Sequence, residues 1–150
     1  MKILILGAGR VGGSLARELV DNGYDVSVID LDKSALSSLE ENLDIMTVEG
    51  HAAHPISIKK AGADDSTTVI AVTSDDQVNI IGCQIAKRKF KVNKTICRLT
   101  EESYSEDLEI FGEKVIDIVI SPENDVMTHL KELIFHPGAQ QIENFADGKV

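Results

Sequence analysis

The sequence predicts a doubly wound α/β domain with a six-stranded parallel sheet. Short apolar runs alternate with stretches of helical periodicity along most of the chain, and such alternation requires crossover connections and therefore a parallel sheet. A glycine-rich turn joins the first apolar run to the first helical stretch, which is typical of doubly wound domains. Together with right-handed crossovers, these features predict the strand order 3-2-1-4-5-6 with helices on both faces.

The first half of the chain contains three strand–helix units. Residues 2–6 form the first expected strand, and Val11, Leu15 and Leu19 give the next helix one apolar face. Gly23 is expected to end that helix. The following elements are a strand over residues 25–29, a helix over residues 34–42, a strand over residues 45–48, and a short helix that Pro55 begins and Gly62 ends.

The second half continues the alternation. Residues 68–73 are almost continuously apolar, as a central parallel strand buried on both faces should be. A helix over residues 76–90 follows, and we expect Val78, Ile81 and Ile85 on its inward face. The remaining elements are a strand over residues 95–99, a helix over residues 101–111, a strand over residues 115–120, and a last helix from Pro122 with the stripe Val126, Leu130, Leu133 and Ile134.

The chain divides into two unequal parts. Residues 1–138 are expected to form the domain, which ends at a Pro-Gly pair. Residues 139–150 include an alternating polar and apolar stretch that resembles a first strand. We expect these residues to be the start of a truncated second domain or a tail.

Composition excludes several classes of partner. The formal net charge is −10, which argues against nonspecific binding to nucleic acid and against docking on anionic lipid. No apolar run approaches the length of about 20 residues that spans a bilayer. The two cysteines, Cys83 and Cys97, fit buried small apolar residues of an intracellular protein. The expected location is therefore the cytoplasm.

The turn Gly7-Ala8-Gly9-Arg10-Val11-Gly12 fits the pattern G-x-G-x-x-G. In this pattern the first glycine permits a tight turn, the second lets the backbone approach a pyrophosphate, and the third lets the helix pack closely on the sheet. Phosphates then lie at the helix N-terminus, where N–H groups and the helix dipole favour negative charge. The turn predicts a Rossmann-type dinucleotide site.

An acidic residue at the end of the second strand completes the pattern. Asp30 lies 23 residues after Gly7 (30 − 7), close to the spacing of about 20 residues expected for the ribose-binding acid. Its carboxylate can accept hydrogen bonds from both ribose hydroxyls and would repel a 2′-phosphate. NAD(H), ATP or ADP is therefore favoured over NADP. The alternative is a glycine-rich turn in a fold that has lost its ligand.

Other candidate contacts follow the remaining strands, because ligands of this fold lie beyond the carboxyl ends of the strands. His51 and Ala52 could wall an adenine, and Thr73 and Ser74 could donate hydrogen bonds or simply cap the next helix. Burial of the Arg98 guanidinium inside an apolar run costs free energy unless the guanidinium pairs with an anion. That anion is a phosphate or, alternatively, an acid such as Asp75. Arg10, in the glycine turn, is either a second phosphate contact or a solvated side chain.

Two further clusters have simpler interpretations. His51 and His54 are three residues apart, but no third ligand is near them in the sequence, and a structural zinc site normally has four ligands. We therefore expect no metal site. The basic run over residues 87–91 lies at the end of a helix, where cations complement the helix dipole.

The sequence favours binding over catalysis. A short-chain dehydrogenase needs a tyrosine followed four residues later by a lysine, but Tyr24 is followed by Val28 and Tyr104 by Leu108. No nucleophile, base and oxyanion donor come together, so we expect no catalytic residues. The alternatives are the NAD-binding domain of a dehydrogenase whose catalytic part lies elsewhere, and an assembly module with a structural nucleotide.

The chain resembles the TrkA-N family, the N-terminal domains of regulatory subunits of Trk-type potassium uptake systems, and more broadly the domains that regulate potassium conductance. The later blocks are more specific than the glycine turn, which is generic to Rossmann folds. The blocks that carry the resemblance are residues 1–12, 28–30, 50–52, 71–76 with Asn79, 96–98, 120–123 and 135–139.

The resemblance implies a function beyond what spacing shows. Members bind NAD(H), and in relatives ATP or ADP, without turning it over, and the family's ligand contacts map onto residues 7–11, Asp30, Thr73, Ser74 and Arg98. Members form homodimers that assemble into larger rings beneath a membrane-embedded potassium-translocating subunit, at the inner face of the cell membrane. The helix after Pro122 would be the crossover that packs on a partner subunit. The expected ligand contacts are Gly7, Ala8, Gly9, Arg10, Val11, Gly12, Asp30, His51, Ala52, Thr73, Ser74 and Arg98.

Overall fold

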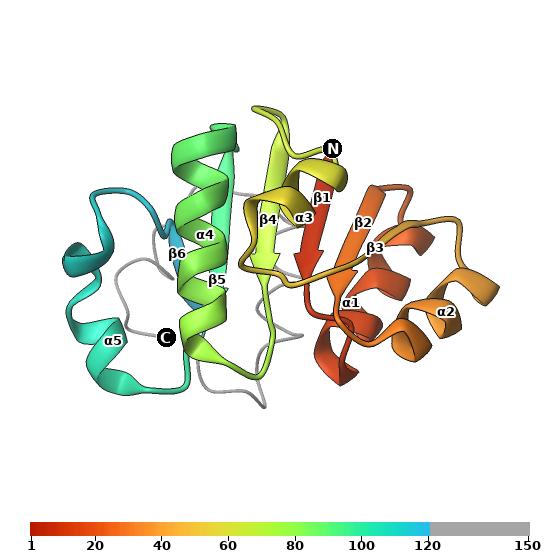
Figure 1. Ribbon diagram of the computed structural model, residues 1–150, viewed down its shortest axis with the longest axis horizontal. Helices are drawn as coiled ribbons and strands as arrows, with labels where there is room; N and C mark the ends of the chain where they lie inside the picture. The colour runs from red at the N-terminus through yellow and green to blue at the C-terminus, as the bar shows by residue number, and fades with distance from the viewer. Residues whose placement is uncertain (121–150) are drawn as a thin grey trace.

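A computed structural model describes residues 1–120 of the chain. A six-stranded parallel sheet with the order β3-β2-β1-β4-β5-β6 forms its centre (Figure 1), which confirms the predicted fold class and strand order. The strands are β1 (Lys2–Leu6), β2 (Asp25–Asp30), β3 (Met46–Glu49), β4 (Thr67–Ala71), β5 (Lys94–Arg98) and β6 (Ile118–Ile120).

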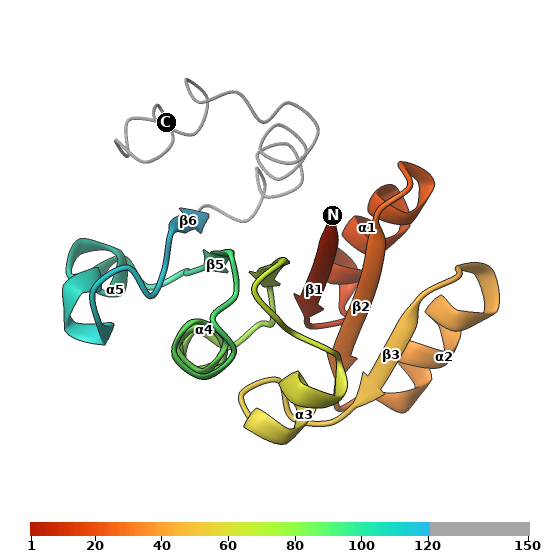
Figure 2. The same ribbon diagram turned by 90° about the horizontal axis from the view of Figure 1, so that it is seen from above.

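Helices cover both faces of the sheet. Seen from above, α1 and α2 lie on one side, and α3 and α4 lie on the other (Figure 2). The helices are α1 (Arg10–Asp21), α2 (Lys33–Asn42), α3 (Pro55–Lys60), α4 (Asp76–Phe90) and α5 (Glu102–Glu106), with a 3₁₀ turn, η1, over Leu108–Phe111. Within residues 1–120 no helix has the length and apolarity needed to cross a membrane.

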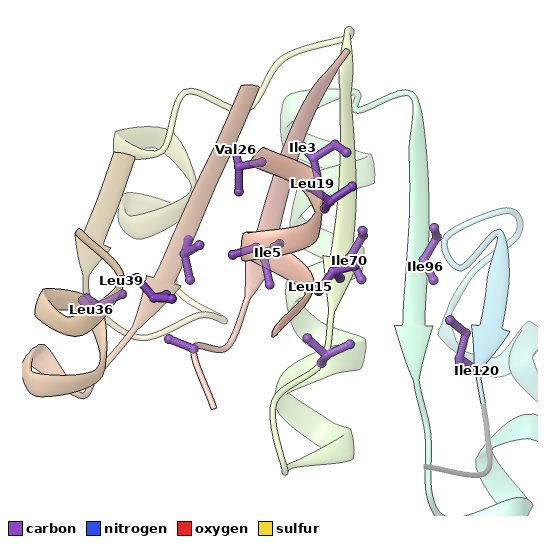
Figure 3. Close-up of a cluster of buried hydrophobic side chains, with 14 of the residues drawn as sticks. Ile3, Ile5, Leu15, Leu19, Val26, Leu36, Leu39, Ile70, Ile96 and Ile120 are labelled. Atoms are coloured by element: carbon purple, nitrogen blue, oxygen red, sulfur yellow. The ribbon is translucent and has the colours of Figure 1, made fainter. Parts of the chain in front are cut away.

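Two apolar cores result from the alternation of side chains along the strands. Ile3 and Ile5 of β1 belong to the core beneath α1 and α2 (Figure 3), and Leu4 and Leu6 belong to the core beneath α3 and α4. All four side chains are essentially inaccessible to solvent. Each such side chain stabilises the fold by about 1.5–3 kcal/mol, so β1 anchors both layers and fixes the position of the glycine turn that follows it.

The predicted helix over residues 101–111 is wrong as a continuous element. It divides at Asp107, whose backbone angles (φ −138°, ψ 49°) are not helical, into the short helix α5 and the 3₁₀ turn. The rings of Tyr104 and Phe111 pack edge to face with centroids 5.6 Å apart. This contact packs η1 against α5, which favours the interruption of the helix at Asp107.

The last described strand is shorter than predicted. Residues 115–117 precede β6 rather than extend it, and side chains make several of the hydrogen bonds that join them to β5. The hydroxyl of Thr95 donates to the carbonyl of Val115 (2.6 Å), and the carboxylate of Asp117 accepts from the N–H of Thr95 (2.8 Å). Lys87 pairs with the same carboxylate at 2.8 Å, so a polar cluster supplements the one backbone bond, from the N–H of Asp117 to the carbonyl of Thr95, that joins the two segments here.

The inward face of α4 differs from the prediction at one position. Val78 and Ile85 pack against the core as predicted, but Ile81 is 44% exposed, whereas Asn79, Ile80 and Cys83 are buried. Asn79, although polar, is inside because its side chain is fully hydrogen-bonded, as described below. The predicted helix after Pro122, the domain boundary at residue 138 and the strand-like segment over residues 139–150 lie outside the described residues.

Candidate functional site

A cleft of about 380 Å³ lies at the carboxyl ends of β1, β2, β4 and β5. This is where the fold brings strand ends together on either side of the point at which strand order reverses, between β1 and β4. Backbone and side chains from six segments of the chain line it. These residues are Gly7, Gly9, Arg10, Val11, Ile29, Asp30, Leu31, His51, Ala52, Val72, Thr73, Ser74, Asp75, Val78 and Arg98.

Two glycines of the turn are required by the fold itself. Gly7 has φ +110°, in the region that favours glycine, and a Cβ there would lie 3.1 Å from the backbone N and Cα of Thr73. A Cβ on Gly12 would overlap the carbonyl oxygen of Gly7. These two positions therefore let the end of β1 pack against both β4 and α1.

Gly9 has a different role, because a Cβ there would meet nothing within 4 Å. It is the N-cap of α1 with an extended backbone (φ −73°, ψ −162°), and no side chain among the described residues caps this helix. In contrast, Asp32 caps α2 and Asp75 caps α4 through their carboxylates. The N-terminus of α1 thus faces the cleft with free space in front of it, which suits an anion.

Asp30 holds the glycine turn from the neighbouring strand. Its carboxylate accepts a hydrogen bond of 2.6 Å from the N–H of Ala8 and one of 2.8 Å from the N–H of Asp32. Each carboxylate oxygen has about two acceptor sites, so each keeps one for a further donor. Asp30 also lines the cleft, and its remaining acceptors can receive the hydroxyls of a ribose.

The loop after β3 forms another wall, with His51 and Ala52 lining the cleft. The Nδ1 atom of His51 accepts a hydrogen bond from the N–H of Ala53 (3.0 Å), so the ring orientation is fixed. Its ring stacks on that of His54 with centroids 4.3 Å apart and an interplanar angle of 16°. Within residues 1–120 no group of three or more His, Cys, Asp or Glu side chains could hold a metal ion.

The opposite wall comes from the ends of β4 and β5. Thr73 and Ser74 line the cleft with Arg98, and the Nη1 atom of Arg98 donates to the carbonyl of Thr73 at 3.3 Å. The cap of α4 is Asp75, which accepts from the N–H groups of Gln77 and Val78. Neither Thr73 nor Ser74 has the capping role that was the alternative to ligand contact.

The structure brings together almost all of the predicted site residues. Ala8 and Gly12 are the two that do not line the cleft: Ala8 is 7% exposed, and its N–H is bonded to Asp30. Both act on the shape of the turn. The cleft residues that were not among the predicted ligand contacts are Ile29, Leu31, Val72, Asp75 and Val78. Ile29, Leu31 and Val72 lie at or beside a strand end, whereas Asp75 and Val78 belong to the N-cap and first turn of α4.

The chemistry of the cleft is that of a binding site. Its N–H groups and two arginines supply positive potential. The carboxylates of Asp30 and Asp75 hold backbone N–H groups, and Asp30 keeps acceptor sites for a further donor. An anion and a polyhydroxylated group fit these features, because they match helix N–H groups and a carboxylate acceptor respectively.

Comparison with solved structures supports the fold. The TrkA-N domain of the inner membrane protein ybaL from Escherichia coli superposes with a TM-score of 0.72 at 20% identity, over 89% of this chain and 96% of that one. The GsuK channel bound to NAD gives a TM-score of 0.68 at 20% identity, over 88% of this chain and 23% of that one. GsuK bound to ADP gives 0.66 at 25% identity, over 91% and 34%.

Sequence comparison gives the family. A Trk system potassium uptake protein TrkA from Halomonas elongata is 42% identical over 152 residues, and one from Vibrio alginolyticus is 38% identical over 153 residues. Each alignment covers 100% of this chain and 33% of the relative, so the chain spans about a third of the length of these relatives. With its glycine turn, its acid at the end of β2 and a match to the TrkA-N domain over residues 3–122, the chain belongs to the TrkA-N domain family.

Proposed function

We propose that this domain binds NAD(H), or an adenine mononucleotide such as ATP or ADP, in the cleft and uses the bound ligand to regulate a potassium uptake system. The observation that carries the proposal is the pairing of an open helix N-terminus at Gly9 with the carboxylate of Asp30 across the same cleft. In this proposal the helix N-terminus binds phosphate and the carboxylate of Asp30 binds ribose. The complexes of the GsuK channel with NAD and ADP support the same classes of ligand here.

The proposed contacts are those predicted from the sequence. The turn from Gly7 to Gly12 receives the phosphates, Asp30 receives the ribose hydroxyls, and His51 with Ala52 walls the base. Thr73, Ser74 and Arg98 contact the part of the ligand beyond the first phosphate. No step of this proposal changes the ligand chemically, and the names of the relatives, which are potassium uptake proteins, support regulation rather than catalysis.

Regulation requires two arrangements of subunits that bind the nucleotides with different affinity. A ligand with equal affinity for both arrangements would shift nothing. We propose that homodimers assemble into a ring on a membrane-embedded potassium-translocating subunit, at the cytoplasmic face of the cell membrane. The nucleotide that prefers one arrangement then biases the transporter.

Calorimetric titration of the chain with NAD⁺, NADH, ATP and ADP, each in a separate experiment, tests binding. The expected result is exchangeable binding with affinities that differ among the four ligands. Sedimentation with each ligand then tests whether the assembly changes with the ligand. Equal affinities with identical assembly would remove the regulatory mechanism, and a nucleotide that copurifies and never exchanges would instead indicate a structural role.

A hydride-transfer assay tests the dehydrogenase alternative. The chain, supplied with NADH and a panel of carbonyl compounds, should leave the NADH absorbance unchanged. Oxidation of NADH that depends on the protein and on a carbonyl substrate would overturn the assignment of a binding function.

A further inference from the structure

We infer that Asn79, a buried residue of α4 that does not line the cleft, positions the walls that bind the phosphates of the nucleotide. The inference rests on the proposed nucleotide function and extends it to a residue outside the contact set. Asn79 is 0% exposed, although an amide side chain is costly to bury unless its hydrogen bonds are made. The hydrogen-bond partners of Asn79 therefore indicate its role.

All four hydrogen-bonding positions of the Asn79 amide are used. The Oδ1 atom accepts from the N–H of Thr73 (3.0 Å) and from its hydroxyl (2.6 Å). The Nδ2 atom donates to the carbonyl of Thr73 (3.1 Å) and to the carbonyl of Arg98 (2.9 Å). An amide offers two acceptor and two donor positions, so this side chain is saturated by two residues of the cleft.

The Asn79 side chain supplies hydrogen bonds between the ends of β4 and β5, at the place where the backbones of these two strands no longer pair. The pairing of β4 with β5 ends at Ala71 and Cys97. Beyond it, the carbonyls of Thr73 and Arg98 are joined through the amide of Asn79 instead of through a ladder. The side chain of Asn79 therefore bridges these two strand ends, and the bond from the Nη1 atom of Arg98 to the Thr73 carbonyl adds a second link.

The same residue reaches the glycine turn through Thr73. A Cβ on Gly7 would lie 3.1 Å from the backbone N and Cα of Thr73, so the turn packs directly on the residue that Asn79 holds. Arg98 is tied in as well, since its Nη1 atom donates to the Thr73 carbonyl. Asn79 thus holds Thr73, which supports the turn that would hold the first phosphate and accepts a bond from the guanidinium on the other wall.

The consequence is specific to phosphate-bearing ligands. The base and the ribose would meet the loop after β3 and Asp30, and within residues 1–120 the Asn79 side chain bonds to neither of them but only to Thr73 and Arg98. Loss of the Asn79 amide should weaken the binding of a nucleoside diphosphate and leave the binding of the nucleoside itself nearly unchanged. A purely structural role would affect both ligands alike.

The test compares ADP and adenosine as probes with the variant Asn79→Asp. Aspartate keeps the size of asparagine but has no donors, and it faces two carbonyl oxygens. We expect the dissociation constant for ADP, measured by calorimetry, to rise at least tenfold, and that for adenosine, measured by ligand-detected NMR, to change less than twofold. The control is Ile80→Ala, a neighbouring buried residue of α4, which should weaken the fold but preserve the ratio of the two constants.

A double-mutant comparison tests whether Asn79 affects phosphate binding partly through Arg98. In an Arg98→Ala background, Asn79→Asp should raise the ADP constant less than it does in the wild type, because part of what it positions is gone. If Asn79→Asp does not fold, Asn79→Ser, which has one hydroxyl and no charge, replaces it. The expected change in the ratio of the ADP and adenosine dissociation constants is the same. Equal weakening of ADP and adenosine, or an unchanged ADP constant, would overturn the inference. If the wild type binds NAD⁺ but not ADP, NAD⁺ replaces ADP as the phosphate-bearing probe with the same expected result. If the wild type binds none of these ligands, the proposed function fails instead.

Discussion

The N–H of Ala8 donates a hydrogen bond of 2.6 Å to the carboxylate of Asp30. This bond links the glycine turn after β1 to the end of β2, and the same carboxylate also accepts from the N–H of Asp32. The acid expected to receive a ribose is therefore also a support for the turn expected to receive the phosphates. Its removal should affect stability as well as binding.

Replacement of Asp30 by alanine should abolish measurable nucleotide binding and lower the free energy of unfolding by about 1–3 kcal/mol, because a partly buried N–H of Ala8 loses its acceptor. Calorimetry and denaturant unfolding measure the two effects. The matched control is Asp32→Ala, which removes the cap of α2 at a cost of about 1 kcal/mol but does not alter a cleft-lining residue. An Asp30→Ala variant that bound NAD⁺ as tightly as the wild type would contradict the assigned ribose contact.

The glycine turn allows a contrast between two alanine substitutions three residues apart. Gly9→Ala should leave stability within about 0.5 kcal/mol of the wild type, because its Cβ meets no atom within 4 Å, yet it should weaken nucleotide binding at least tenfold by filling the space for a phosphate. Gly12→Ala should destabilise the fold by about 1–3 kcal/mol or more, since its Cβ would overlap the Gly7 carbonyl.

Thermal unfolding and calorimetry of both variants separate these roles. A Gly9→Ala variant with normal affinity would mean that no ligand approaches α1 at its N-terminus. A Gly12→Ala variant as stable as the wild type would mean that the turn can move away from α1.

Much of the fold could be predicted from the sequence, because its signals are local. Alternating strands and helices leave few arrangements once crossovers are right-handed, and a residue that follows a parallel strand is placed at the same sheet edge as those that follow its neighbours. Asp30, Thr73 and Arg98 could therefore be assigned to one cleft although they are far apart in the chain.

The features that were missed depend on long-range hydrogen bonds. Asn79 is polar, so periodicity placed apolar neighbours such as Ile81 inward instead, whereas the structure buries Asn79 because Thr73 and Arg98 satisfy it. Similarly, β6 was predicted too long, whereas Asp117, in the segment before it, bonds to Thr95 through its side chain. No periodicity of apolar residues encodes such partners.

A pH dependence of stability should arise at the start of β1. Hydrogen bonds from Ser66 and Lys2 hold the pKa of the Asp64 carboxyl well below its ordinary value. A lowered pKa in the folded state stabilises the protein above the unfolded-state pKa, which is about 3.9 for aspartate, and this stabilisation is lost as the pH falls through the folded-state value. The Asp64→Asn variant should therefore be less stable than the wild type at pH 7.

The stability difference between Asp64→Asn and the wild type should narrow as the pH falls below about 4. Unfolding by urea at a series of pH values measures it. Ser66→Ala, which removes a hydroxyl donor at 2.7 Å from the same carboxylate, should reproduce part of the effect. A difference that stays constant down to the most acid pH would show that the contacts of Asp64 do not distinguish its two protonation states.

The two cysteines should be chemically silent in the folded protein. Cys83 and Cys97 are both 0% exposed, and a hydrogen bond to Cys97 together with complete burial raises the pKa of the Cys83 thiol well above its ordinary value. Because the thiolate is the reactive form, a thiol-specific chromogenic disulfide at pH 8 should modify neither residue until the protein unfolds. Two equivalents should react at once in guanidinium chloride, since the chain has two cysteines.

The variants Cys83→Ala and Cys97→Ala assign any residual reactivity to one thiol. Each should react with one equivalent when unfolded and none when folded, at a cost in stability that reflects the cavity left in the core beneath α4. Slow modification of the folded wild type that accelerates with denaturant would measure local opening of α4 from β5. Rapid modification of one thiol in the folded protein without denaturant would instead mean that this core is open to solvent, and would contradict the packing of α4 on which the placement of Asn79 depends.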